Sequence, residues 1–120
     1  MKQIGFRYAL KGLQSAFNSE FNLKIHLGIT VVAVTAGLIL ALSVTEWCLI
    51  IGSITIVFVT ELLNTAIEQL VNLVQPDFHP VAGKVKDISA GAVFVACIGA
   101  VLCGLIIFGS KLFALIEVLV

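Results

Sequence analysis

Charged side chains are scarce in this sequence and make up 12% of its 120 residues. Soluble domains carry about 25% charged and about 45–50% apolar residues, whereas this chain is 60% hydrophobic, with a mean hydropathy of +1.16. The scarcity of charge excludes an ordinary soluble domain and predicts an integral membrane protein that forms one domain, 1–120. The formal net charge is zero, so no nucleic acid is expected as a partner.

Cysteine and proline are also rare. Cys48, Cys97 and Cys103 lie in apolar segments without the spacing of metal ligands, which indicates small, reduced packing residues. Both prolines fall within 75–80, and together with Asp77 they predict a loop there.

Residues 1–22 lack a continuous apolar run, so no cleavable signal peptide is expected. Apolar residues recur on one side of this segment and basic residues on the other, which predicts an amphipathic helix at the membrane surface. Long apolar runs then predict transmembrane helices over 25–43, 47–74 and 81–110. Thr45 is the expected N-cap of the second. The predicted fold class is an all-α integral membrane protein with one surface helix and three transmembrane helices, and we expect oligomerisation to bury its polar groups.

Basic residues gather on only two of the segments outside the predicted spans. Lys2, Arg7, Lys11 and Lys24 precede the first span, Lys84 and Lys86 precede the third, and the 43–46 connection has none. The positive-inside rule therefore predicts that the N-terminus and the 75–87 segment face the cytoplasm.

Four polar residues interrupt the second predicted span: Glu61, Asn64, Glu68 and Asn72. At about 100° per residue they share one helix face. A carboxylate in or near the hydrocarbon costs about 2.5–3.5 kcal/mol, so a polar stripe at membrane depth indicates a functional site. The alternative is a hydrogen-bonded seam between helices.

Two further polar clusters flank the spans. Glu20, Asn22, Lys24 and His26 offer the i,i+4 pairs Glu20/Lys24 and Asn22/His26, with a simple polar boundary as the alternative. Lys84, Lys86 and Asp87 open the third helix. The alternatives there are snorkelling basic residues and a local Lys84–Asp87 pair.

The three clusters together provide the groups that a nucleotide site requires. Glu20, Glu61 and Glu68 can hold Mg²⁺ or remove a proton, and Lys84 with Lys86 suits phosphates. Gly83-Lys84 lacks the spacing of a Walker A motif, and the set of protein-kinase motifs is also missing.

The arrangement of these clusters resembles the prokaryotic diacylglycerol kinase family, which includes undecaprenol kinases. The resemblance rests on Glu61-Leu-Leu-Asn64-Thr-Ala-Ile-Glu68, on His79-Pro80, on Lys86-Asp87-Ile-Ser-Ala-Gly-Ala-Val93 and on Glu20-x-Asn22-x-x-x-His26. It implies a homotrimer in the bacterial inner membrane, with composite sites near the cytoplasmic face that use ATP and Mg²⁺ to phosphorylate a lipid hydroxyl.

The resemblance also implies a role for each matching residue. Glu61 would be the catalytic base, Asn64 would position the reacting groups, and Glu20 and Glu68 would bind the metal. Lys86 would contact the phosphates of the nucleotide, and Asp87 and His79 would line the nucleotide side of the site. Asn72 stands where an acidic residue is expected, and this departure bears on nucleotide affinity. Lys24 stands where Arg is expected, and lysine cannot form the two parallel hydrogen bonds of a guanidinium group.

The lipid acceptor stays open between undecaprenol and diacylglycerol, and the N-terminal signature favours undecaprenol. Two other classes of function are an oligomeric ion conductor and a structural membrane subunit. A conductor needs ionisable groups through the full membrane depth, and the outer halves of the predicted spans lack them. A structural subunit leaves Lys84, Lys86 and Asp87 without a role.

Overall fold

The computed structural model describes residues 2–120, with side chains described from Gly5 onward. It contains four helices: α1 (Lys2–Ser19), α2 (Phe21–Ile39), α3 (Val44–Val74) and α4 (Pro80–Leu119). The last three are long and apolar enough to span a membrane, which confirms the prediction of an all-helical chain with three such helices. The side chains of residues 1–4, at the start of the predicted surface helix, lie outside the described part.

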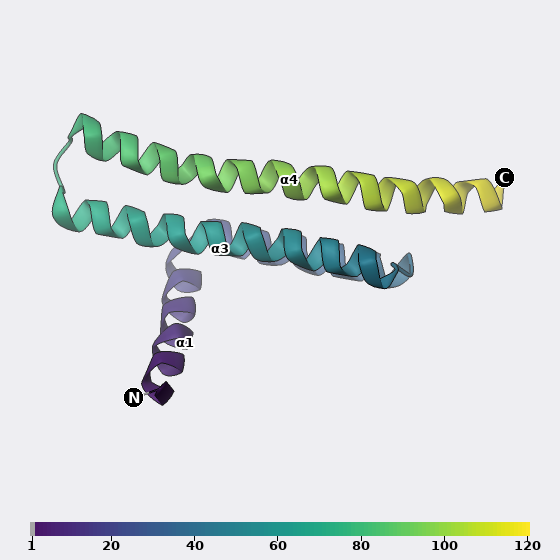
Figure 1. Ribbon diagram of the computed structural model, residues 1–120, viewed down its shortest axis with the longest axis horizontal. Helices are drawn as coiled ribbons and strands as arrows, with labels where there is room; N and C mark the ends of the chain where they lie inside the picture. The colour runs from purple at the N-terminus through teal and green to yellow at the C-terminus, as the bar shows by residue number, and fades with distance from the viewer. Residues whose placement is uncertain (1) are drawn as a thin grey trace.

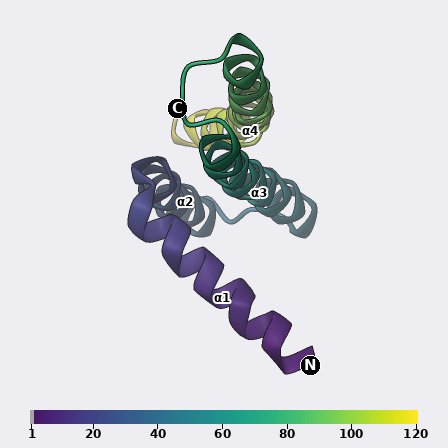
Figure 2. The same ribbon diagram turned by 90° about the vertical axis from the view of Figure 1, so that its left-hand side faces the viewer.

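The three long helices run roughly side by side, and α3 lies between α2 and α4 (Figures 1 and 2). The most extensive packing in the molecule joins α3 to α4. Helix α1 leaves this layer at a steep angle (Figure 1). Because the layer is open rather than a closed bundle, most apolar side chains of a single chain remain exposed.

The break between α1 and α2 lies at Glu20, whose backbone is extended, with φ −110° and ψ 111°. The N–H of Glu20 still bonds to the carbonyl of Ala16, over 2.9 Å, so the break is a sharp bend without a loop. Ala16 and Leu23, on either side of the bend, are both buried. The predicted surface helix over 1–22 therefore ends earlier, at Ser19.

The turn from α2 to α3 is closed by a Schellman-type contact. Ala41 adopts a left-handed conformation, with φ 54°, at a position where glycine is more usual. The N–H of Leu42 bonds back to the carbonyl of Gly37 over 3.2 Å, and the side chain of Leu42 is buried. This contact ends α2 at Ile39, before the expected boundary of 43.

Helix α3 begins at Val44 with a capping box rather than at the predicted cap. The hydroxyl of Ser43 accepts from the N–H of Glu46 over 3.2 Å, and the Glu46 carboxylate accepts from the N–H of Ser43 over 2.9 Å. The prediction of Thr45 as N-cap was wrong, because Thr45 already lies inside the first turn.

A small hydrophobic core holds the helices together beside this turn. It consists of Leu42, Ile50 and Ile107, with the partly buried Trp47 packed against it. Gly37 lets α2 approach Trp47 closely, because a Cβ at this position would lie 2.7 Å from Cη2 of the indole.

We expect Gly37→Ala to destabilise the protein by about 1–3 kcal/mol, the usual effect of overpacking. Gly28→Ala on the same helix is the matched control, because its Cβ would meet nothing within 4 Å. Alanine there gains about 0.8–1.0 kcal/mol of helix propensity. Unfolding in micelles, followed by the fluorescence of the single Trp47, compares the two. A Gly37→Ala variant as stable as Gly28→Ala would contradict this packing role.

The loop after α3 ends at His79, which caps α4. Its Nδ1 accepts from the N–H of Val81 over 3.1 Å, and Pro80 occupies the first helical position. Helix α4 continues beyond the expected end of the third span at 110 and stops at Leu119. Its 40 residues rise about 60 Å, roughly twice a hydrocarbon core. In Figure 1 its C-terminal end extends past the α2–α3 turn.

Candidate active site

Glu61 is a buried carboxylate at the contact between α2 and α3. The residue is only 5% exposed, and its Oε1 lies 3.1 Å from Nε2 of His26 on α2. Phe58, one turn earlier on α3, sets its ring edge-on to the imidazole, with the ring centroids 6.3 Å apart. The carboxylate is therefore held by a specific polar partner within apolar surroundings.

The next residues of the polar stripe form a second pair on the same helix. Nδ2 of Asn64 donates to Oε1 of Glu68 over 3.3 Å, and both residues are half-buried. Oδ1 of Asn64 is buried and finds no hydrogen-bond partner within the part of the chain that the structure describes. An unsatisfied buried acceptor costs about 1–3 kcal/mol, so this atom is available to a donor from a ligand.

Asn72, at the far end of the stripe, contacts the first part of α4. The ammonium group of Lys86 donates to its side-chain carbonyl. Asn72 is neutral, so the contact fixes the position of Lys86 without cancelling its charge. An acidic residue here would form an ion pair with Lys86 instead.

Two local ion pairs considered from the sequence are not formed. Within residues 5–120, whose side chains the structure describes, the one lysine–carboxylate ion pair is Lys111–Glu46, and His26 lies within hydrogen-bond distance of Glu61. The Glu20/Lys24 pair is missing because Glu20 lies at the bend, outside the regular turn that brings i and i+4 together. Lys84 and Asp87 are both exposed, and neither pairs with the other.

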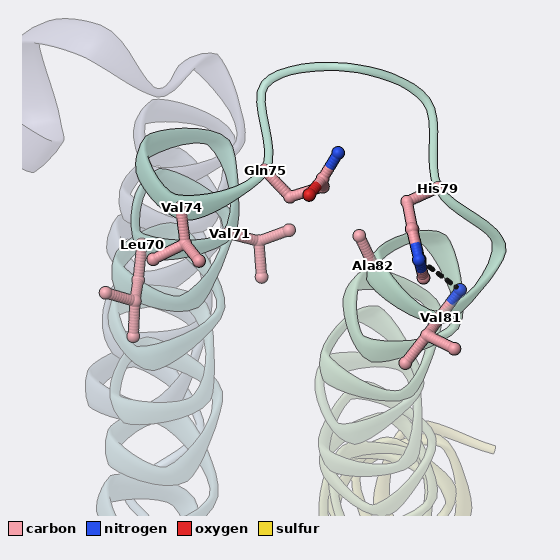
Figure 3. A pocket seen from close by; sticks show the side chains of 7 residues that line it. All are labelled: Leu70, Val71, Val74, Gln75, His79, Val81 and Ala82. Carbon is pink, nitrogen blue, oxygen red and sulfur yellow. Dashed lines mark hydrogen bonds between the residues drawn. The ribbon is translucent and has the colours of Figure 1, made fainter.

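A cavity of about 340 Å³ lies between the end of α3 and the start of α4 (Figure 3). Its walls are mainly apolar, with the side chains of Gln75 and His79 as its polar members: Leu70, Val71, Val74, Gln75, His79, Val81 and Ala82. A smaller adjoining pocket includes His79, Gly83 and Lys86. The predicted nucleotide-side residues His79 and Lys86 therefore line the same pocket.

An apolar groove of about 210 Å³ begins at His26 and involves all three long helices. Three residues of each helix line the groove. In order of increasing distance from the α3–α4 loop they are His26, Ile29 and Thr30 on α2, Phe58, Val57 and Ile54 on α3, and Cys97, Ala100 and Val101 on α4. The Glu61–His26 pair thus lies at the loop-side end of a groove that continues along the apolar helices.

The family model of prokaryotic diacylglycerol kinases matches residues 7–108. The chain belongs to the prokaryotic diacylglycerol kinase family. The prediction of a lipid-kinase family is thereby confirmed, and all the candidate site residues fall within the matched range.

Named members of the diacylglycerol kinase family are about one third identical to this chain over the aligned residues. The undecaprenol kinase of Bacillus subtilis is 37% identical over 107 residues, covering 89% of this chain and 87% of that protein. The diacylglycerol kinase of Synechocystis is 38% identical over 102 residues, covering 84% and 58% respectively. That of Escherichia coli is 31% identical over 103 residues, covering 86% and 84%.

No three side chains of His, Cys, Asp or Glu gather as a ready-made metal site among the described residues of this family member. The two predicted metal ligands, Glu20 and Glu68, lie at the α1–α2 bend and on α3. A metal bound by them must take further oxygens from elsewhere, as Mg²⁺ does when it binds nucleotide phosphates.

The contact that sequence reasoning missed is the one between His26 and Glu61. The sequence places His26 only in a boundary cluster and in the family signature, because a lone histidine at the start of a span is common there. Thirty-five residues separate the two side chains. One feature of the sequence could have indicated this contact. The helices α2 and α3 are antiparallel, so His26 near the start of α2 and Glu61 in the second half of α3 both lie toward the end of the molecule that carries the α3–α4 loop.

Proposed function

We propose that this chain is an ATP- and Mg²⁺-dependent lipid kinase that phosphorylates the hydroxyl group of a membrane lipid. The observation that carries this proposal is Glu61, which is 5% exposed on a helix fit to span a membrane. A carboxylate buried on such a helix is energetically expensive and is therefore a candidate functional group. Its position at the end of an apolar groove suits a hydroxyl presented by a lipid.

In the proposed reaction Glu61 acts as the general base. It takes the proton of the lipid hydroxyl while that oxygen bonds to the γ-phosphorus of ATP. The bond from the γ-phosphorus to the bridging oxygen breaks, and ADP leaves with the electron pair. Asn64 positions the reacting groups through its amide. Such a reaction depends on positioning and charge neutralisation more than on covalent catalysis.

Oxygen ligands suit the proposed metal. Glu20 and Glu68 supply carboxylates, and Mg²⁺ commonly uses one or two of these together with phosphate oxygens. Bound there, Mg²⁺ would neutralise charge on the phosphates. Lys84 and Lys86 bind the phosphates, and Asp87, His79 and Asn72 line the nucleotide side. The neutral contact from Asn72 supports this assignment, because it leaves the charge of Lys86 for the phosphates.

We further propose a homotrimer in the bacterial plasma membrane, with the α3–α4 loop and the site at the cytoplasmic face. Support comes from the open three-helix layer, which leaves long apolar surfaces on α2 and α4 for neighbouring copies. Helix α1 would lie on the membrane surface, which would cover its exposed Phe6 and Tyr8.

Undecaprenol is the favoured acceptor over diacylglycerol. The groove that starts at His26 has a volume of about 210 Å³, smaller than the roughly 300–1,000 Å³ of most ligand pockets. One slender chain that ends in a hydroxyl fits it better than two acyl chains joined through ester groups.

The test is transfer of the γ-phosphate of ATP by the purified protein in mixed micelles. Undecaprenol and diacylglycerol are offered in parallel, each with and without Mg²⁺. We expect transfer only with Mg²⁺, and faster transfer to undecaprenol. An equal or higher rate with diacylglycerol would reverse the acceptor assignment. A folded oligomer that phosphorylates neither lipid would contradict the proposed function.

A further inference from the structure

His26 is the one polar side chain that holds Glu61 among the described residues. Nε2 of the imidazole and Oε1 of the carboxylate are 3.1 Å apart, and the two side chains are 18% and 7% exposed. The second carboxylate oxygen, Oε2, takes part in none of the hydrogen bonds of the described residues. One oxygen of Glu61 is therefore occupied and the other is free.

Apolar packing fixes the imidazole in this place. The ring of Phe58 meets it edge-on, and Phe58 in turn stacks on Phe17 of α1, with those ring centroids 6.0 Å apart. Side chains from three helices therefore fix the orientation of the His26 ring: His26 itself on α2, Phe58 on α3 and Phe17 on α1. An imidazole held in this way can orient a carboxylate that would otherwise rotate about its side-chain bonds.

Burial makes such a partner necessary. An isolated ionised carboxylate in apolar surroundings is strongly unfavourable, and a hydrogen bond to the charged form offsets part of that penalty. The ionised form is the one that can accept a proton. Without His26, the carboxylate of Glu61 would lose the polar side chain that contacts its Oε1.

We propose that His26 is a positioning residue of the kinase reaction: its Nε2–H donates to Oε1 of Glu61, which aims Oε2 at the lipid hydroxyl. This inference rests on the proposed function of Glu61 as the base. The proton of the hydroxyl passes to Oε2 of Glu61, and His26 keeps its own proton throughout. His26 touches neither the nucleotide nor the reacting phosphorus.

The first experiment compares His26→Leu with His26→Gln, because only glutamine retains an N–H donor of similar reach. We expect His26→Leu to lower kcat about 100-fold, the effect of a misplaced catalytic group. The KM for Mg-ATP should stay within about twofold, and His26→Gln should recover to within about tenfold of the wild-type kcat. Thr35→Val on the same helix is the control, since its exposed hydroxyl bonds only to its own helix.

Three outcomes would overturn the proposal. One is a His26→Leu variant with wild-type kcat. Another is equal loss of kcat and of affinity for ATP, which indicates structural damage. The third is a His26→Gln variant no better than His26→Leu. Glu61→Gln separates these results from a failure of the proposed function. If that variant is inactive while His26→Leu is active, only the positioning role is lost; if Glu61→Gln is active, the assigned base is wrong.

A second measurement does not depend on activity or on a His26 variant that folds. The chain contains two histidines, so ¹⁵N-imidazole spectra in micelles can be assigned with His79→Gln. We expect Nε2 of His26 to carry a proton and its resonance to shift when Glu61 is replaced by Gln. An Nε2 without a proton, or a resonance unaffected by Glu61→Gln, would show that the contact is not formed in this way.

Discussion

Glu61→Gln should lower the rate of phosphoryl transfer by about 10²–10⁴-fold, the usual contribution of a general base. Glutamine has nearly the shape of glutamate and can still contact His26, but its amide cannot accept the proton of a hydroxyl. The loss should therefore appear in kcat, with little change in the KM for Mg-ATP. Phosphate transfer to lipid in mixed micelles, at saturating ATP, measures it.

Glu46→Gln provides the matched control for this prediction. Glu46 lies in the first turn of the same helix as Glu61, where it completes the capping box with Ser43 and pairs with Lys111 over 3.1 Å. Glutamine also completes a capping box, so the helix start is preserved. We expect Glu46→Gln to retain wild-type kcat. A Glu61→Gln variant that transfers phosphate as fast as Glu46→Gln would contradict the role of Glu61 as base.

Lys86→Met should lower kcat/KM for Mg-ATP by roughly 10–100-fold. Hydrogen bonds to charged groups contribute about 1.5–3 kcal/mol each, and methionine keeps the length of the side chain while removing its charge. The loss should fall mainly on the nucleotide, because Lys86 sits with Asn72 and His79 at the loop end of α3 and α4, away from the apolar groove. Steady-state kinetics test this prediction: the ATP concentration is varied at saturating lipid, and the lipid concentration is then varied at saturating ATP.

Lys111→Met is the control for Lys86→Met. It removes a lysine from the same helix and breaks a partly exposed ion pair with Glu46, a kind of contact that contributes little to stability. Its kinetic constants should match those of the wild type. A Lys86→Met variant that raises the KM for lipid and leaves the KM for ATP unchanged would show that Lys86 belongs to the acceptor side instead.

Asn72 illustrates how the structure changes the meaning of a departure from the family pattern. From the sequence, a neutral residue in place of an acidic one pointed to an effect on nucleotide affinity. The contact with Lys86 supplies a physical reason, since a neutral acceptor holds the lysine without consuming its charge. Lys86 and Asn72 are 14 residues apart, and only the packing of α4 on α3 brings them together.

Local chemistry was sufficient to predict the helices and the loops between them. The length of each apolar run, the two prolines at 76 and 80 and the helical spacing of Glu61, Asn64 and Glu68 are properties of short segments. Helix ends were less predictable. Ser43 and Thr45 are both residue types that favour an N-cap, and α4 runs on to Leu119 through a segment without proline.

The sequence by itself determined the class of protein, its three long apolar helices, and the candidate side chains of a lipid-kinase site. The partners of those side chains were decided only by the tertiary structure. Spacing along one helix settles which residues share a face, but it carries no information about the neighbouring helix. His26 meets Glu61 because the bend at Glu20 and the capped turn at Ser43 set how α2 lies against α3.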